Sequence, residues 1–312
     1  MTAPASSASA TLPHSTLRPT LRIAAIGDIH DCWGATDNAL IEQLDVDLVL
    51  FVGDFGNESL STIRQVARVP RPAAAIYGNH DAWYTASPWG RGKRPYDIHT
   101  DNWFEQQLEI LNDLEIGYRY RDFSHLNLSV IGGRPFSWGG SEWKYKKFYR
   151  DRYGVKNFAD SIAKQVEAIE QATHDTLIFL GHTGPTGMGD QPEDPCGKDW
   201  NPIGGDYGDP DFAAAIDQAI AIDKHVPLVV FGHMHHNLRH RSDRLRRAIH
   251  HNDSGTLFFN AARVPRIIQQ DTQTLHQFSL IEITNGTVTT INLVWLNPDG
   301  AKLKEEAIYR DK

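Results

Sequence analysis

The sequence is short of cysteine, of long apolar runs and of basic residues, and each shortage excludes a class of protein. Its 312 residues include two cysteines, Cys32 and Cys196, which are too few for a disulfide scaffold and fit a reducing compartment. No window approaches the roughly 20 apolar residues that a membrane-spanning helix needs. The formal net charge is −8, which argues against non-specific nucleic-acid binding, because that requires a basic face. We therefore expect a cytoplasmic protein that binds neither a membrane nor nucleic acid.

The hydrophobic content of 40% and the charged content of 22% are ordinary for a globular protein, and no repeat or linker divides the chain. Residues 1–20 are rich in Ala, Ser, Thr and Pro and lack the apolar centre of a secretory signal. We expect them to form a disordered tail, with a plastid transit segment as a remote alternative. A single domain is expected over residues 21–298, followed by a polar tail or short helix over residues 299–312.

Short apolar runs alternate with amphipathic stretches, which predicts the α/β class. The clearest predicted strands cover residues 21–26, 48–52, 73–77, 127–131, 176–180 and 227–231. The predicted helices cover residues 36–44, 58–69, 103–114, 158–172 and 211–223, the last of them capped by Asp211. Asn285-Gly286 is a favoured two-residue turn and predicts a hairpin that joins residues 278–283 to residues 288–294.

Two segments lack any such periodicity. Residues 82–102 are a mixture of Trp, Pro, Gly, Arg and Lys, and residues 183–210 are rich in Gly, Pro and Asp. Loops of this length inside a compact domain are usually functional. We expect both segments to narrow a pocket, which favours small substrates over protein partners. Residues 239–251, polar and basic, are expected to form a solvated loop or ribbon.

Several predicted strands end in a glycine that is followed by residues able to bind a metal ion. These residues are Asp28 and His30, Asp54, Asn79 and His80, His182, and His233 and His235. Each junction alone is more often an ordinary turn or a core histidine, but the whole series is hard to obtain by chance. Ligands of open α/β sheets gather at the carboxyl ends of the strands, so we expect these side chains to share one edge. Gly232 is expected to permit a sharp change of direction where its strand ends.

Carboxylates, imidazoles and one amide, without a thiolate, suit borderline divalent ions such as Mn, Fe, Zn or Co. The set is too large for one ion that keeps an open catalytic position. It suits two ions that share a carboxylate, an arrangement that can orient a bridging hydroxide and stabilise a phosphoryl displacement.

The blocks GDIH, GD, GNHD, GH and GHMH resemble the signature of the calcineurin-like metallophosphoesterases over about residues 26–235. The resemblance implies a four-layer αββα sandwich with two central mixed β-sheets. It implies one metal held by Asp28, His30 and His235, a second held by Asn79, His182 and His233, and Asp54 as the bridge. His80 would bind no metal and would face the leaving-group oxygen. The implied reaction is hydrolysis of a small phosphate mono- or diester through a metal-bridging hydroxide, with manganese as the foremost candidate metal.

Four positions refine this expectation. Asp31 stands where many members of the family carry glycine, and it is either a hydrogen-bond partner of a metal-binding imidazole or a turn residue. Phe55 and Asp81 stand where the protein-phosphatase branch carries arginine, which argues against a Ser/Thr protein phosphatase. Arg134 follows a predicted strand and is either a ligand of the substrate phosphate or a structural arginine.

Two further hypotheses concern a non-catalytic role and the two cysteines. Some proteins of this fold are binding scaffolds with a degraded metal site, although the intact ligand set argues against that here. Cys32 and Cys196 would either couple on oxidation and close the site or remain unrelated thiols.

Overall fold

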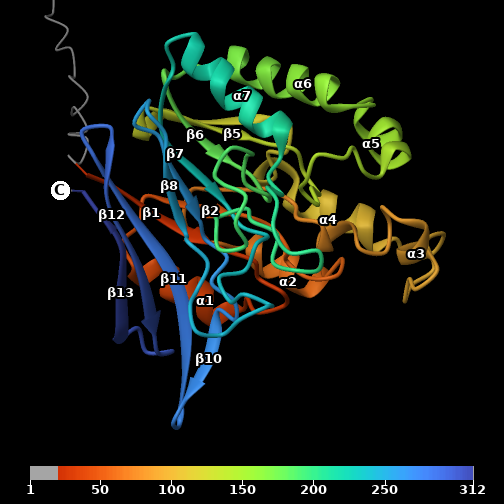
Figure 1. Ribbon diagram of the computed structural model, residues 1–312. Coiled ribbons are helices and arrows are strands. Elements are labelled where there is room, and N and C mark those ends of the chain that lie inside the picture. The colour runs from red at the N-terminus through yellow and green to blue at the C-terminus, as the bar shows by residue number, and fades with distance from the viewer. Residues whose placement is uncertain (1–19, 312) are drawn as a thin grey trace, which may run out of the picture.

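The computed structural model describes residues 20–311, and two β-sheets packed face to face form its centre (Figure 1). The disordered tail predicted for residues 1–20 therefore lies outside the described residues, except for Thr20, which begins the first strand.

The first sheet has seven strands in the order β13-β12-β11-β1-β2-β3, with β10 paired to β11. Its strands are β1 (Thr20–Ile26), β2 (Leu48–Phe51), β3 (Ala73–Ala75), β10 (Ile267–Gln270), β11 (Gln273–Thr284), β12 (Thr287–Leu296) and β13 (Lys302–Arg310). The pairs β1–β2 and β2–β3 are parallel, and the other pairs are antiparallel. The sequence LVLF of β2 is apolar throughout because both faces of a central parallel strand are buried.

The second sheet has six strands in the order β4-β5-β6-β7-β9-β8. Its strands are β4 (Tyr120–Phe123), β5 (Leu128–Gly132), β6 (Thr176–Leu180), β7 (His225–Phe231), β8 (Ile249–His251) and β9 (Leu257–Asn260). The central pairs are parallel, whereas β4 and β8 pair antiparallel at the two edges. Both sheets are therefore mixed, as the resemblance implied.

Helices cover the outer face of each sheet (Figure 1). The first sheet packs against α1 (Ala35–Gln43), α2 (Leu60–Val66) and α4 (Trp103–Leu111), and the second against α6 (Phe158–Gln171) and α7 (Pro210–Ala221). A third apolar cluster, which includes Leu50 and Val230, fills the space between the sheets. These four layers confirm the predicted αββα sandwich. Of the helices between residues 20 and 311, none could serve as a membrane span.

The smaller helices lie in the connections. They are α3 (Pro88–Arg91), α5 (Lys146–Tyr153) and the 3-10 turns η1 (His80–Ala82), η2 (Asn112–Leu114) and η3 (Ser124–Leu126). The segment 82–102, expected to be without regular structure, thus contains α3 and the end of η1.

Two predicted helix starts are wrong for identifiable reasons. The helix predicted from residue 58 begins at Leu60, because Glu58 is buried and its φ of 54° is left-handed. The helix predicted to be capped by Asp211 begins one residue earlier, at Pro210, a residue favoured in the first turn. Asp209 is its N-cap residue, and Asp211 is buried and paired to Arg134.

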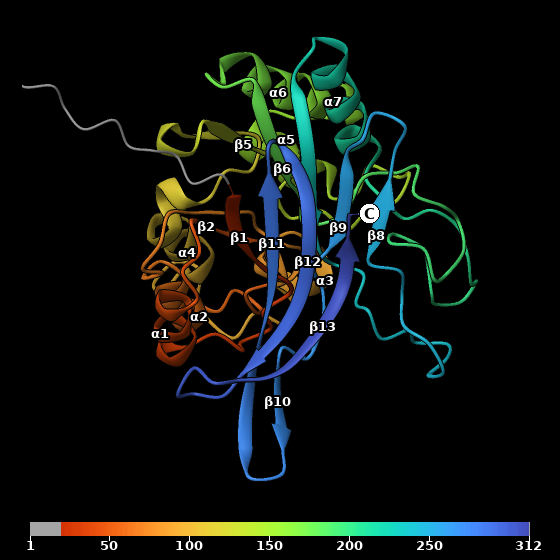
Figure 2. The same ribbon diagram turned by 90° about the vertical axis from the view of Figure 1, so that its left-hand side faces the viewer.

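The C-terminal residues form a strand, which corrects the prediction of a polar tail or short helix over residues 299–312. β13 pairs with β12 along most of its length, and Figure 2 shows β11, β12 and β13 side by side. Most residues of β13 are exposed, so its sequence lacks the apolar alternation of a half-buried strand. Lys and Glu on an edge strand also discourage pairing with another chain.

The hairpin predicted around Asn285-Gly286 is confirmed, and it joins β11 to β12. Asn285 and Gly286 have φ values of 52° and 81°, as a turn with two left-handed central residues requires. The predicted solvated ribbon at residues 239–251 ends in β8.

Candidate metal centre

The loops that follow β1, β2, β3, β6 and β7 bring the predicted ligands together at the carboxyl ends of these strands. Three sets of side chains each have one candidate ligand atom apiece within 4.8 Å of one another: Asp28, His30 and His235; His30, Asp54 and His80; and Asp54, His182 and His233. The expectation that these side chains meet at the carboxyl ends of strands is therefore confirmed, but the strands belong to two sheets and do not share a single sheet edge.

The first cluster is built around the buried carboxylate of Asp28. Its Oδ1 accepts a hydrogen bond from the backbone N–H of His233 at 3.0 Å. Its Oδ2 is buried without a hydrogen-bond partner, 3.2 Å from Nε2 of His235. Nε2 of His235 also lies 3.2 Å from Nε2 of His30. A buried carboxylate oxygen without a hydrogen bond, facing two imidazole nitrogens, suits a cation at this point.

Burial alone would raise the pKa of Asp28, but the imidazole of His235, 3.2 Å away, holds it well below its usual range. The carboxylate of Asp28 is therefore ionised and could hold a metal ion.

The second cluster is organised by His182, which is fully buried. Its Nδ1 lies 2.7 Å from the carbonyl oxygen of Val52, and donation to that oxygen leaves a lone pair on Nε2. Nε2 faces Oδ1 of Asn79 at 3.0 Å and Oδ1 of Asp54 at 3.3 Å. Three electron-rich atoms thus converge, and a cation between them would convert their repulsion into coordination.

His233 completes this cluster, with its ring centroid 5.1 Å from that of His182. Burial lowers the pKa of His233 to about 3, so its imidazole is neutral, as metal binding requires.

Asp54 lies between the two clusters. Its Oδ1 is 3.3 Å from Nε2 of His182, and its Oδ2 is 3.9 Å from Nε2 of His30. Its backbone has a left-handed φ of 50°, an uncommon conformation that tends to occur at functional sites. Each oxygen of this carboxylate therefore faces a histidine of a different cluster, so Asp54 could contribute a ligand atom to both.

His80 lies at the rim of the site and is held from three sides. Its backbone N–H donates to Oδ1 of Asp54 at 2.9 Å, and its Nδ1 lies 2.6 Å from Oδ1 of Asn57. Its ring stacks on Trp83 at 4.5 Å and meets the edge of His30 at 4.9 Å. Burial lowers the pKa of His80. The roles of Asn57 and Trp83 are not visible in the sequence, because only tertiary contact brings these residues to His80.

Asp81 and Asn260 support the loops that carry the candidate ligands, and neither role was predicted from the sequence. Asp81 accepts hydrogen bonds from the backbone N–H groups of Phe55 and Gly78, at 2.9 and 2.7 Å, and thereby ties two loops together. Its burial raises its pKa well above the usual value. Asn260 donates from Nδ2 to the carbonyl of Met234 at 2.8 Å, which supports the loop of His233 and His235. The polar residue at the end of the apolar strand β9 was the available clue.

Glycines before the ligands leave room for the carboxylates. A Cβ on Gly78 would lie 2.3 Å from Oδ1 of Asp54, and a Cβ on Gly232 would lie 2.2 Å from Oδ1 of Asp28. Gly53, by contrast, has a φ of 94° and supplies a left-handed turn. The chain does turn after Gly232, where the backbone N–H of Met234 donates to the carbonyl of Gly232 at 2.8 Å, but the φ of Gly232 is not left-handed, so the residue also serves by leaving out a side chain.

Arg134 does not reach the metal centre, which contradicts its predicted contact with a substrate phosphate. Its side chain is 3% exposed, and its Nη2 lies 2.5 Å from Oδ1 of Asp209 while its Nε lies 3.1 Å from Oδ2 of Asp211. Its guanidinium also packs on the ring of Trp143 at 4.9 Å. Arg134 is the structural arginine that the sequence analysis kept as the alternative.

Asp31 fits the turn-residue alternative. Its carboxylate accepts a hydrogen bond from the hydroxyl of Thr62 at 3.2 Å, and its φ is a left-handed 64°.

Cys196 is 1% exposed in the apolar cluster under α7, whereas Cys32 is half-buried beside Arg266, and both are free thiols. This placement supports two unrelated cysteines.

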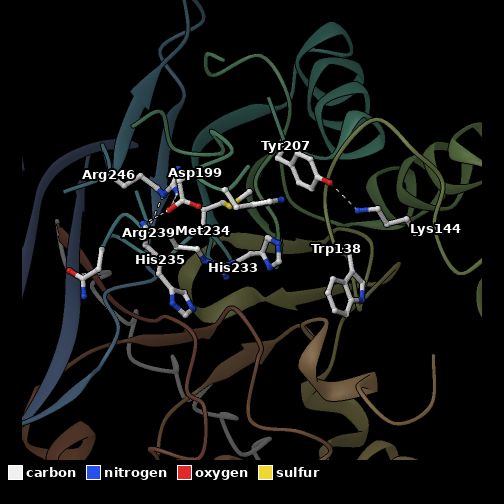
Figure 3. A pocket seen from close by; sticks show the side chains of 11 residues that line it. Trp138, Lys144, Asp199, Tyr207, His233, Met234, His235, Arg239 and Arg246 are labelled. Atoms are coloured by element: carbon white, nitrogen blue, oxygen red, sulfur yellow. Dashed lines mark hydrogen bonds and ion pairs between the residues drawn. The ribbon is translucent and has the colours of Figure 1, made fainter. Parts of the chain in front are cut away.

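A cavity of about 370 Å³ opens beside His233 and His235 (Figure 3). Asp199, Trp200 and Tyr207, from the segment 183–210, line it together with Trp138, Lys144 and Arg239. The expectation that this long segment narrows a pocket is confirmed. The other segment, 82–102, contributes no lining residue here and instead lines a separate cavity of about 870 Å³ beside α5.

This chain is similar to several known proteins. A family model described as calcineurin-like phosphoesterase matches residues 21–237. A protein of Thermus thermophilus is similar in structure with 12% identity and a TM-score of 0.48, over 93% of this chain and 100% of that one. A purple acid phosphatase from yellow lupin (Lupinus luteus) seeds has 14% identity and a TM-score of 0.44, over 92% of this chain and 53% of that one. An archaeal phosphodiesterase has 13% identity and a TM-score of 0.33, over 92% and 99%.

Among curated proteins, no sequence matches this one. The family model spans most of the chain, including every residue of the clusters described above. The chain belongs to the calcineurin-like phosphoesterase family and is a metal-dependent phosphoesterase.

Proposed function

We propose that this protein hydrolyses a small phosphate mono- or diester with two divalent metal ions. The observation that carries the proposal is the placement of Asp54, whose two carboxylate oxygens face His182 and His30 in different clusters. A shared carboxylate is what a pair of closely spaced ions requires.

In this proposal Asp28, His30 and His235 hold one ion, Asn79, His182 and His233 hold the other, and Asp54 is shared. The unpartnered Oδ2 of Asp28 and the Nε2 lone pair of His182 support the assignment. The donor set of carboxylate, imidazole and amide suits Mn foremost, with Fe, Zn or Co as alternatives. When bound, the two ions would supply Lewis acidity toward the phosphoryl group and would activate the attacking water.

His80 takes no metal in this proposal and faces the leaving-group oxygen. The contacts with Asn57 and Trp83 hold its ring in one orientation, and preorganised groups stabilise developing charge without reorganising. The His80 ring lies next to His30, and the backbone of His80 contacts Asp54. Because both neighbours are proposed metal ligands, the His80 ring would lie close to a phosphoryl group bound at the metal ions.

We further infer that the substrate is small and that the protein acts in the cytoplasm without a nucleic-acid partner. The cavity of about 370 Å³ supports the first inference, because it lies within the range of small-molecule sites, roughly 300–1,000 Å³. The net charge of −8 supports the absence of a nucleic-acid partner.

The test is hydrolysis of p-nitrophenyl phosphate and bis-p-nitrophenyl phosphate by protein that has been stripped of metal and reloaded with manganese. We expect manganese-dependent turnover and two bound ions per chain by elemental analysis. The preferred ester would distinguish a phosphatase from a phosphodiesterase. A single bound ion at full activity would overturn the dinuclear assignment, and bound metal without turnover of any phosphate ester would favour the scaffold alternative.

A further inference from the structure

Two basic side chains at the cavity beside the metal centre have no carboxylate partner. Lys144 and Arg239 both line the cavity, and in the described part of the chain neither forms an ion pair. Figure 3 shows them on opposite sides of His233 in this view. Two cations facing a shared cavity, in a protein of net charge −8, create a local site for an anion.

The other charges at this cavity are already satisfied. The buried guanidinium of Arg246 lies 3.2 Å from Oδ2 of Asp199, and its Nη1 donates to the carbonyl of Gly197 at 2.6 Å. Oδ2 of Asp199 also accepts a hydrogen bond from the backbone N–H of Arg239 at 2.9 Å. Arg246 and Asp199 therefore neutralise each other, and the charges of Lys144 and Arg239 remain available.

Aromatic rings complete the lining. Trp200 and Tyr207 meet edge to face with centroids 4.9 Å apart, and Trp138 contributes a third ring. Nζ of Lys144 lies 4.9 Å from the Tyr207 centroid, and the guanidinium carbon of Arg239 lies 5.5 Å from the Trp200 centroid. Rings of this kind pack well against a planar group, and the stacking tolerates many ring systems.

The loop that carries Trp200 and Tyr207 is fixed in place. The backbone N–H of Gly140 donates to the carbonyl of Tyr207 at 2.9 Å, and the end of the loop is held by the ion pair between Arg134 and Asp209. Because this wall of the cavity is already ordered, less conformational entropy is lost when a ligand binds.

We propose that the substrate of this enzyme carries a planar aromatic group and a second anionic group beside the reacting phosphate, as a nucleotide does. Trp200 and Tyr207 bind the planar group, Arg239 binds the second anion, and the reacting phosphate lies at His233 and His235, while Lys144 adds positive charge on the other side of the cavity. This inference names the substrate class of the proposed phosphoesterase and rests on that function.

The test compares three esters with the same p-nitrophenolate leaving group on the manganese-loaded enzyme. They are methyl p-nitrophenyl phosphate, thymidine 5′-(p-nitrophenyl phosphate), and the latter with an added 3′-phosphate. The second adds a planar base to the first, and the third adds a second anion. We expect kcat/KM to rise at each addition.

Two variants test which side chains cause these increases in kcat/KM. Trp200→Ala should reduce the kcat/KM ratio of the second ester to the first on the order of tenfold, the usual effect of losing one stacking ring. Arg239→Met should reduce the ratio of the third ester to the second by roughly tenfold, as loss of a charge-assisted contact does. Arg244→Met is the matched control, because Arg244 is on the same loop and pairs with Asp243 at 3.7 Å outside the cavity lining. It should change neither ratio.

The outcomes separate the two proposals. If neither these three diesters nor the monoester p-nitrophenyl phosphate is hydrolysed with manganese bound, the proposed phosphoesterase function on small esters is wrong. If p-nitrophenyl phosphate is hydrolysed and none of the three diesters is, the catalytic proposal stands and the assignment of this cavity is overturned. If all three are hydrolysed with equal kcat/KM, or if Trp200→Ala and Arg239→Met leave both ratios unchanged, the catalytic proposal stands and the assignment of this cavity is overturned.

Discussion

Replacing Arg134 by methionine tests whether this arginine is structural. The substitution keeps much of the side-chain volume but leaves the carboxylates of Asp209 and Asp211 buried without their cation. Both carboxylates are almost fully buried, at 2% and 0% exposure. Removing one partner of such a buried pair usually costs about 3–5 kcal/mol, because the remaining charge is uncompensated.

The assay is urea unfolding followed by tryptophan fluorescence. With a urea dependence of about 3 kcal/mol per molar, the expected loss would lower the unfolding midpoint by roughly 1–1.7 M. Arg150→Met is the matched control, because Arg150 is largely exposed and pairs with Asp151 on the surface. Its midpoint should stay at the wild-type value.

A second substitution sharpens the interpretation. Adding Asp209→Asn to Arg134→Met removes one uncompensated charge, so the double variant should be more stable than the sum of the two single losses predicts. The reasoning would be refuted if Arg134→Met unfolded like the wild type while its KM for a phosphate ester rose sharply. That result would restore Arg134 as a substrate ligand.

Three further predictions concern the metal centre and a buried acid. Asp54→Ala should lower bound metal, measured by elemental analysis, and activity together, on the order of a hundredfold or more, whereas the exposed Asp243→Ala should change neither. His80→Ala should keep the metal content and lower kcat by roughly 10²–10⁴-fold, and an unchanged kcat would remove its assigned role. Burial raises the pKa of Glu115 to about 7, so the folded state binds this proton more tightly than the unfolded state and stability is lost as the pH rises toward 7. Glu115→Gln should therefore raise the free energy of unfolding more at pH 8.5 than at pH 5, by on the order of 2 kcal/mol, and an equal effect at both pH values would contradict this.

The sequence predicted which side chains meet at this site because its information is local. Each candidate ligand follows an apolar run and a glycine, so the strand, its end and the side chain are all visible within a few residues. The hairpin at Asn285-Gly286 was predictable for the same reason, since two left-handed residues are encoded by the dipeptide itself.

Features that depend on distant partners were not predictable in this way. Arg134 carries a structural role only because Asp209, 75 residues away, is folded onto it. Asn57 has no distinguishing pattern around it in the sequence and becomes important only where His80 contacts it. β13 was missed because its backbone pairing with β12 defines the strand, while both of its faces remain largely exposed.

The glycines that precede the ligands have a consequence for how this site tolerates change. The carboxylate of Asp54 occupies the space where a side chain on Gly78 would lie, and the carboxylate of Asp28 occupies the corresponding space at Gly232. The ends of strands that are distant in the sequence can therefore approach each other only because these two residues have no side chain. A scan of single alanine substitutions would rank both glycines with the essential residues, although they offer no group to metal or substrate. We therefore expect substitutions to be tolerated less at these strand ends than in the surrounding loops.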